Sequence, residues 1–252
     1  MTILQDSWLL TGRMMKHMTR SIDTIISVVI MPIMVMLAFV YIFGGAMSIP
    51  QESYKGFILP AILLFTIASG VGYTAFRLND DVKNGVFDRF NSMPISRLAV
   101  LNGHVFTSVF FNFISTLVVL LVGILIGFRP QADLLDWLAI VGLILLTNYA
   151  LSWIAVFFGL IAKSNESASV FSYLLLGLLF ISSGFVPTGT LPKALQGFAD
   201  HQPMTSIINS LRMLLTDGKF SQELLTAVIW LIGVTLIFQF LAIRFYYKKM
   251  LK

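Results

Sequence analysis

Six apolar stretches divide this chain of 252 residues, and polar or charged residues separate them. Each stretch has 19 to 26 residues, and a helix needs about 20 apolar residues to cross a bilayer. Only 12 % of the residues are charged, whereas a soluble domain carries roughly a quarter. The sequence therefore predicts a single all-α integral membrane domain, 1–252, with six transmembrane helices. The predicted spans are 25–43, 57–76, 105–128, 137–162, 168–186 and 224–243.

Lysine and arginine are distributed unevenly between the two ends of these spans. Six spans place both termini on one side of the membrane, and that side holds 12 of the 17 basic residues. Basic residues accumulate in cytoplasmic segments, so we expect both termini and segment 77–104 in the cytoplasm and segment 187–223 outside. The net charge of +5 then reflects membrane orientation, and nucleic acid is not an expected partner. The chain has no cysteine, which excludes disulfides and thiolate metal sites.

Segment 1–23 precedes the first span and has the pattern of an amphipathic helix. Tryptophan and methionine on one face and basic residues on the other are typical of a helix that lies in the membrane interface. We therefore predict an interfacial helix; the alternative is the solvated start of the first span. The expected apolar face is Leu4, Trp8, Thr11, Met15, Met18 and Ile22, opposite Asp6, Arg13, His17 and Arg20.

Segment 77–104 is the only long polar interruption among the spans of the first half of the chain. Asp80 and Asp81 suit a helix start, where negative charge is favourable, and Pro94 suits a helix end. An apolar stripe between them predicts a short amphipathic helix that docks on a soluble partner, the alternative being an ordinary solvated loop. The stripe consists of Val82, Val86, Phe90 and Met93.

Segment 187–223 contains prolines that divide it into two apolar stripes. Leu191, Leu195 and Phe198 form the first stripe, and the second follows Pro203. The stripes predict two short helices, which lie on the outer surface or dip back into the bilayer against other helices. A plain outer loop is the alternative. The second stripe is Ile207, Ile208, Leu211, Leu214 and Leu215.

Ionisable side chains are scarce within the spans, and the chain lacks the G-x-x-x-x-G-K-[ST] motif that holds nucleotide phosphates. Its three histidines are too scattered to suggest a metal site. Intramembrane charge marks ion pathways, so its scarcity argues against a secondary carrier and a membrane-embedded enzyme. Polar groups in spans usually form interhelical hydrogen bonds, but with aromatic rings they also suit a pathway for a bulky, mostly apolar substrate. The candidate pathway residues are Phe65, Ser69, Tyr73, Phe110, Asn112, Asn148, Ser152 and Trp153.

Two stretches of the sequence carry a family resemblance. Residues 85–97 read GVFDRFNSMPISR and run on to Asn-Gly-His at 102–104, while SSGFVP at 182–187 is followed by LRMLL at 211–215. The chain thereby resembles the ABC-2-type exporter permeases, and the DRF and SMP elements point to the daunorubicin-resistance branch. His104 departs from that branch, which usually has arginine at this position.

The resemblance implies a permease subunit that is not itself an enzyme. It would dimerise with a second copy, bind two copies of a separate ATP-binding cassette ATPase subunit, and sit among lipids of the bacterial cell membrane. ATP and Mg²⁺ would bind to the ATPase, so no cofactor is expected in this chain. The implied function is export of a hydrophobic or amphipathic compound (a drug, antibiotic or lipid); export of a lipid-linked polysaccharide is the alternative within the family.

The resemblance also gives roles to the segments around the spans. Segment 1–23 would be the elbow helix of the family, segment 187–223 its short extracellular helices, and segment 77–104 would hold the coupling helix that contacts the ATPase. The implied coupling residues are Val82, Gly85, Val86, Phe87, Asp88, Arg89, Phe90, Met93 and Pro94.

Overall fold

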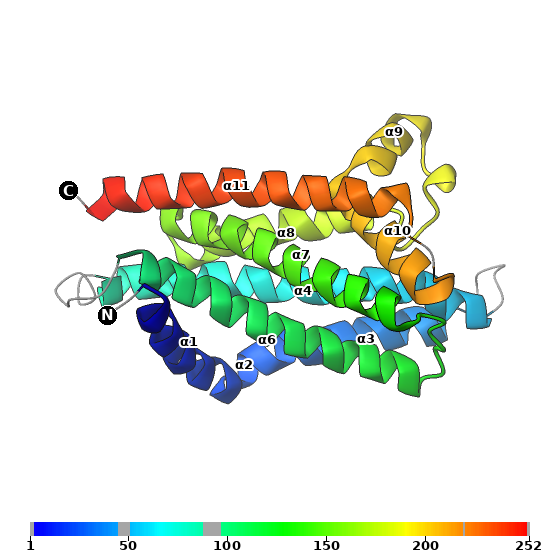
Figure 1. Cartoon of the computed structure of the whole chain (residues 1–252), viewed down its shortest axis with the longest axis horizontal. Coiled ribbons are helices and arrows are strands. Elements are labelled where there is room, and N and C mark those ends of the chain that lie inside the picture. The colour runs from blue at the N-terminus through cyan, green and yellow to red at the C-terminus, as the bar shows by residue number, and fades with distance from the viewer. Residues whose placement is uncertain (1–2, 45–50, 88–96, 219, 251–252) are drawn as a thin grey trace.

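The computed structural model describes residues 3–44, 51–87, 97–218 and 220–250, and within these ranges all regular structure is helical (Figure 1). The long helices run side by side, and both ends of the described chain lie at the same end of the bundle. The prediction of an all-α protein is therefore confirmed for the described residues.

Five helical segments are long and apolar enough to cross a membrane in the described part of the chain. The first, Ile22–Phe43, joins several helical pieces in line, and Pro32 stands at the start of one of them. Proline lacks an N–H and its ring crowds the carbonyl four residues earlier. The helical turn before Pro32 is π-helical. A π-helical turn is wider than an α-helical one and so gives the proline ring room. The pieces are α2 (Ile22–Ile25), η1 (Ile26–Ile30), α3 (Met31–Ala38) and η2 (Phe39–Phe43).

The other four candidate spans match predicted spans two, three, four and six, with longer helices than the apolar stretches alone. Polar residues extend these helices because a helix need not end where the apolar stretch ends. One boundary moved inward: the third span was expected to reach residue 128, but its helix ends at Leu125, and Gly127 adopts a φ of 108° that no helix allows. The four helices are α4 (Gln51–Lys83), α6 (Arg97–Leu125), α7 (Leu134–Ile161) and α11 (Gln222–Met250).

The six-span layout is not confirmed. The fifth predicted span, 168–186, corresponds to α8 (Asn165–Phe180), whose 16 residues are fewer than the roughly 20 that a spanning helix needs. The chain turns after Phe180, and the Gly184 amide donates to the Ser182 hydroxyl at 3.1 Å in place of a helical carbonyl. The hydropathy pattern predicts a span that continues through this turn because the residues of the turn are themselves largely apolar.

The two short helices expected in segment 187–223 are present as α9 (Lys193–His201) and α10 (Pro203–Thr216), after a single 3₁₀ turn, η3 (Thr188–Thr190). The apolar stripe of α10 is buried against the long helices, as its periodicity predicts. On α9, by contrast, Leu195 and Phe198 are exposed. Only the second stripe therefore packs within the chain.

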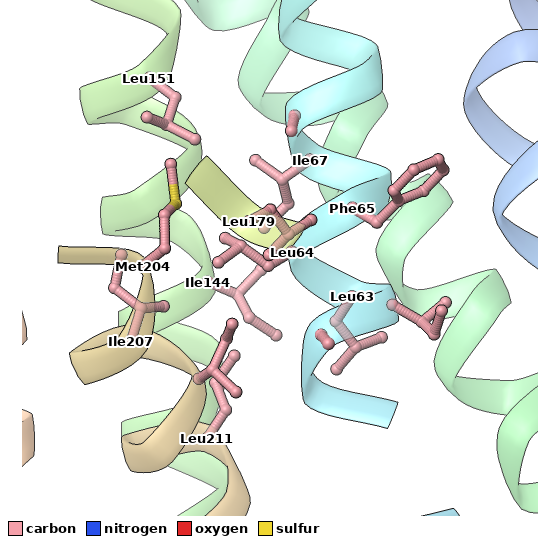
Figure 2. Packing of buried hydrophobic residues seen from close by; sticks show 14 of the residues in the cluster. Leu63, Leu64, Phe65, Ile67, Ile144, Leu151, Leu179, Met204, Ile207 and Leu211 are labelled. Carbon is pink, nitrogen blue, oxygen red and sulfur yellow. The ribbon is translucent and has the colours of Figure 1, made fainter. Parts of the chain in front are cut away.

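The core lies where α4 passes between α6, α7 and α8, with α10 closing one end (Figure 1). Side chains from four helices meet there, and burying them stabilises the bundle mainly through close packing, because lipid is as apolar as the core itself. Figure 2 shows Leu64 and Ile67 of α4 beside Ile144 and Leu151 of α7, Leu179 of α8, and Met204, Ile207 and Leu211 of α10, whereas Phe65 points to the other side of α4.

Segment 1–23 forms a helix, α1 (Ile3–Arg20), that packs across α6 (Figure 1). The expected faces were partly wrong. Asp6, placed on the polar face, is 4 % exposed, whereas Trp8, placed on the apolar face, is 65 % exposed. The close approach is made where Leu10 lies 3.1 Å from the position that a Cβ at Gly103 would occupy. This contact determines which face of α1 turns toward α6, and the apolar periodicity of the sequence does not predict it.

Candidate functional site

A buried cluster of hydroxyl and amide groups joins three of the long helices. The Ser108 hydroxyl of α6 accepts hydrogen bonds from Thr74 of α4 at 2.9 Å and from Ser152 of α7 at 2.8 Å. The amide of Asn112, one turn further along α6, lies 3.3 Å from the same oxygen. All four side chains are buried, so the cluster fixes α4, α6 and α7 relative to one another.

Asn112 occupies a tight position in this cluster. A Cβ added at Gly70 of α4 would collide with the Asn112 amide, so α4 and α6 approach this closely only because residue 70 is glycine. The Asn112 side-chain oxygen is buried and has no hydrogen-bond partner among the described residues. An unpaired buried oxygen of this kind is the polar group with which a ligand or water would pair.

The predicted pathway residues do not line one common cavity. Asn112 and Ser152 meet at Ser108, but Phe65 lies in the core, and Trp153 is buried in a separate cluster around His104 that is described below. The remaining polar side chains bond locally or to other elements. Ser69 donates to the Phe65 carbonyl, and Asn148 donates to the Ile144 carbonyl. The Tyr73 hydroxyl lies 3.3 Å from the hydroxyl of Ser21, the N-cap residue of α2.

Phe110 is the one pathway candidate that lines a large hollow. It is 42 % exposed and lies on a groove of about 1240 Å³ between α1, α6 and α7. Trp8 of α1 meets the Phe110 ring edge-on, with 5.8 Å between ring centroids. The groove is almost entirely apolar, so a hydrophobic molecule fits it and a hydrated ion does not. Its other lining residues include Leu9, Phe106, Val109, Phe113, Leu145, Leu146 and Tyr149.

Sequence reasoning missed two kinds of functional side chain. Ser108, the centre of the polar cluster, was not a candidate, although it precedes Asn112 by one helical turn and so lies on the same face. Trp8 was assigned to an interfacial face rather than to a groove. Only contacts between helices reveal these roles, because the sequence does not specify which faces of α1, α6 and α7 meet.

At the end of the bundle where the termini lie, Phe87 joins segment 77–104 to the long helices. Phe87 is 1 % exposed and lies between His104 of α6, at 6.2 Å between ring centroids, and Tyr246 of α11, at 5.8 Å. Oδ2 of Asp81 in α4 lies 3.4 Å from Nε2 of the same histidine. We call Asp81, Phe87, His104, Trp153 and Tyr246, with the apolar residues packed on them, the His104 cluster.

The predicted helix start at Asp80 and Asp81 is wrong. Both residues lie in the last turns of α4, which ends at Lys83, and Gly85 with a φ of 68° turns the chain there. Negative charge near a helix end is unfavourable on its own. Here Asp80 accepts a hydrogen bond from the Asn165 side chain at 3.1 Å, and Asp81 Oδ2 lies 3.4 Å from His104 Nε2.

The turn at Gly85 also divides the predicted coupling stripe. Val82 belongs to α4 and Val86 follows the turn, and both pack partly against the His104 cluster. Asp88, Arg89, Phe90, Met93 and Pro94 lie outside the described residues.

At the opposite end of the bundle, Arg212 of α10 binds three groups from different segments. Its guanidinium donates to the Phe57 carbonyl of α4 at 3.1 Å, to the Ser183 carbonyl at 2.8 Å and to the Asn209 side chain at 3.0 Å. Its Cζ lies 4.2 Å from the centre of the Phe57 ring. Burial lowers the pKa of Arg212 to about 10, which still leaves the guanidinium charged at neutral pH, so these contacts clamp α10 onto α4.

The described residues bring together no group of three histidine, aspartate or glutamate side chains able to hold a metal ion. The arrangement is instead one of packed helices, a buried polar cluster and an apolar groove. An apolar groove of this size suits hydrophobic molecules rather than ions.

Comparison with known proteins gives the family. Residues 5–216 match the model described as ABC-2 type transporter, which covers most of the chain. The chain belongs to this family. The resemblance noted in segment 85–104 and around residues 182–215 is thereby confirmed, and the protein is an ABC-2 membrane domain.

Relatives of this ABC-2 protein are permease subunits. It is 31 % identical over 228 residues to the daunorubicin resistance ABC transporter permease protein DrrB1 of Streptomyces coeruleorubidus, covering 89 % of this chain and 80 % of the relative. It is 23 % identical to the probable doxorubicin resistance ABC transporter permease protein DrrC of Mycobacterium tuberculosis, covering 90 % and 83 %. It is 25 % identical to the putative transport permease ycf38 of Cyanophora paradoxa, covering 86 % and 76 %.

Proposed function

We propose that this ABC-2 protein is the permease subunit of an exporter that moves a hydrophobic or amphipathic compound out of the bacterial cell. The observation that carries the proposal is the family match together with similarity, across most of both chains, to permeases of drug-resistance transporters. The similarity to drug-resistance permeases favours a drug or antibiotic over a lipid-linked polysaccharide.

In this proposal the energy comes from a separate ATPase subunit. The chain has no phosphate-binding loop of its own, so ATP and Mg²⁺ belong to the partner. Two ATPase copies would serve two copies of the permease. With the termini at one end of the bundle, where most basic residues also lie, that end faces the cytoplasm in our proposal and meets the ATPase.

The coupling stretch 77–104 supplies the contact. Phe87 is buried between His104 and Tyr246, so it is not free to enter a groove on a partner. In our proposal it anchors the stretch to the bundle, and Phe90, three residues further, is the side chain that enters the ATPase. Aromatic anchors of this kind commonly account for about 2 kcal/mol or more of binding energy.

The test is Phe90→Asp in the full chain, coexpressed with its ATPase. A carboxylate is strongly opposed in an apolar pocket, so we expect a correctly inserted permease that no longer copurifies with the ATPase and no longer exports daunorubicin. Phe220→Asp is the matched control, since Phe220 is an exposed phenylalanine at the opposite end of the bundle. Wild-type copurification and export by Phe90→Asp would refute the coupling role.

A further inference from the structure

One exposed face of α1 changes character along its length. Residues spaced by three or four positions share this face, and they are apolar in the first half and basic in the second. The basic side chains are exposed, as are Trp8 and Leu9. The face comprises Gln5, Trp8, Leu9, Gly12, Arg13, Lys16 and Arg20.

The apolar half of this face forms one wall of the groove between α1, α6 and α7. That groove has a volume of about 1240 Å³, larger than the roughly 300–1,000 Å³ of most small-molecule sites. It is lined by long aliphatic and aromatic side chains, and Trp8 stands at its edge against Phe110. A flexible hydrocarbon chain can spread over a large, open and apolar groove of this kind, whereas a compact ring would cover only part of it.

The basic half borders a second hollow of about 890 Å³, lined by Gly12, Arg13, Lys16, Arg20 and Ser21. The two hollows adjoin on α1, because Leu9 lines the first and Gly12, one turn later, lines the second. No atom lies within 4 Å of where a Cβ at Gly12 would be, so the surface between them is open. One molecule can therefore occupy both.

We propose that the α1 face and this groove form a binding site for an anionic phospholipid. The phosphate lies against Lys16 and Arg20, and an acyl chain lies in the groove beside Trp8 and Phe110. Charge complementarity selects this occupant: the basic half attracts an anionic headgroup, repels a cationic amphiphile and gives a zwitterionic lipid little advantage. The site does not depend on which compound the protein exports.

The site can be measured through Trp8, because bromine on an acyl chain quenches a tryptophan that it touches. The purified full chain is reconstituted in nanodiscs with rising fractions of brominated phosphatidylglycerol or brominated phosphatidylcholine. The chain has four tryptophans, so the Trp8 signal is the difference between the wild type and Trp8→Phe. We expect phosphatidylglycerol to quench Trp8 at a clearly lower mole fraction than phosphatidylcholine.

Two variants test the two halves separately. Each basic residue near an anionic lipid contributes about fivefold in affinity, so Lys16→Gln with Arg20→Gln should weaken the phosphatidylglycerol preference by up to about thirtyfold and leave phosphatidylcholine quenching unchanged. Gly12→Leu fills the open surface between the hollows and should reduce quenching by phosphatidylglycerol. Arg129→Gln with Lys193→Gln, two exposed basic residues at the other end of the bundle, is the control and should change nothing.

Three results would overturn the proposal. Equal quenching by the two lipids would show that the groove takes any acyl chain. An unchanged preference in the Lys16 and Arg20 variant would show that these residues do not hold the phosphate. Displacement of brominated lipid by daunorubicin would assign the groove to the exported compound. None of these measurements needs the ATPase, so they are independent of the export test.

Discussion

Replacing Arg212 with methionine should lower the free energy of unfolding by about 3–6 kcal/mol. A hydrogen bond from a charged donor contributes about 1.5–3 kcal/mol, and Arg212 donates to Phe57, Ser183 and Asn209. The Phe57 carbonyl lies inside α4 and has a helical donor as well, and Asn209 Oδ1 also accepts from the Ser183 hydroxyl at 2.7 Å. The bonds to these two acceptors therefore count for roughly half each, and the bond to the Ser183 carbonyl counts in full, which gives the total of about 3–6 kcal/mol. Methionine refills the space of the side-chain stem, and a cavity adds little.

The control for this prediction is Arg129→Met. Arg129 lies at the same end of the bundle, but it is exposed and donates only to carbonyls of its own segment, at 3.2 Å and 3.5 Å. Substitution there should change stability by no more than about 0.5 kcal/mol. Arg212→Lys should fall between the two, because lysine keeps the charge but loses the planar fork and the stacking on Phe57.

Thermal unfolding of the purified variants in one detergent, followed by circular dichroism, measures the difference. For a chain of this size 1 kcal/mol corresponds to about 2–4 °C, so Arg212→Met should unfold at least about 6 °C below the wild type. Equal melting temperatures for Arg212→Met and Arg129→Met would show that the clamp contributes nothing to stability.

Two further predictions concern orientation and helix packing. In this cysteine-free chain, a membrane-impermeant thiol reagent should label Lys193→Cys and not Lys83→Cys in intact cells. Both positions are exposed, and they lie at opposite ends of the bundle. The reverse labelling pattern would refute cytoplasmic termini. Gly70→Ala should lower the free energy of unfolding by about 1–3 kcal/mol because the added Cβ meets the Asn112 amide. Gly142→Ala, whose Cβ would have nothing within 4 Å, should not destabilise the protein. Equal melting temperatures for the two variants would refute the close contact between α4 and α6.

The sequence predicts the presence of the helices far better than their rotation. Hydropathy located all five candidate spans, since twenty apolar residues in a row have few other stable fates. It could not distinguish a side chain that faces lipid from one that faces another helix, because both surroundings are apolar. Phe65 and Phe110 are equivalent in the sequence, yet one lies in the core and the other lines an open groove.

Charged residues show the same limit. Arg129 and Arg212 both belong to segments outside the predicted spans, and positive-inside counting treats them alike. Only the fold shows that Arg212 reaches Ser183 and Phe57, which lie 29 and 155 residues away along the chain. The prediction of a helix start at Asp80 and Asp81 fails for a related reason. Their neighbours Asn165 and His104 come from other helices, and a rule based on the local sequence does not take such contacts into account.

The two ends of the bundle are connected through α4. Oδ2 of Asp81, near one end of this helix, lies 3.4 Å from Nε2 of His104, which also stacks on Phe87. Phe57, near the other end, accepts from Arg212 and so holds α10. The two residues are 24 positions apart on one continuous helix, about 36 Å. Because a close-packed helix moves as a unit, a displacement applied at Phe87 would reach α10 through α4, and Thr74 of the same helix would transmit it to the polar cluster around Ser108 as well.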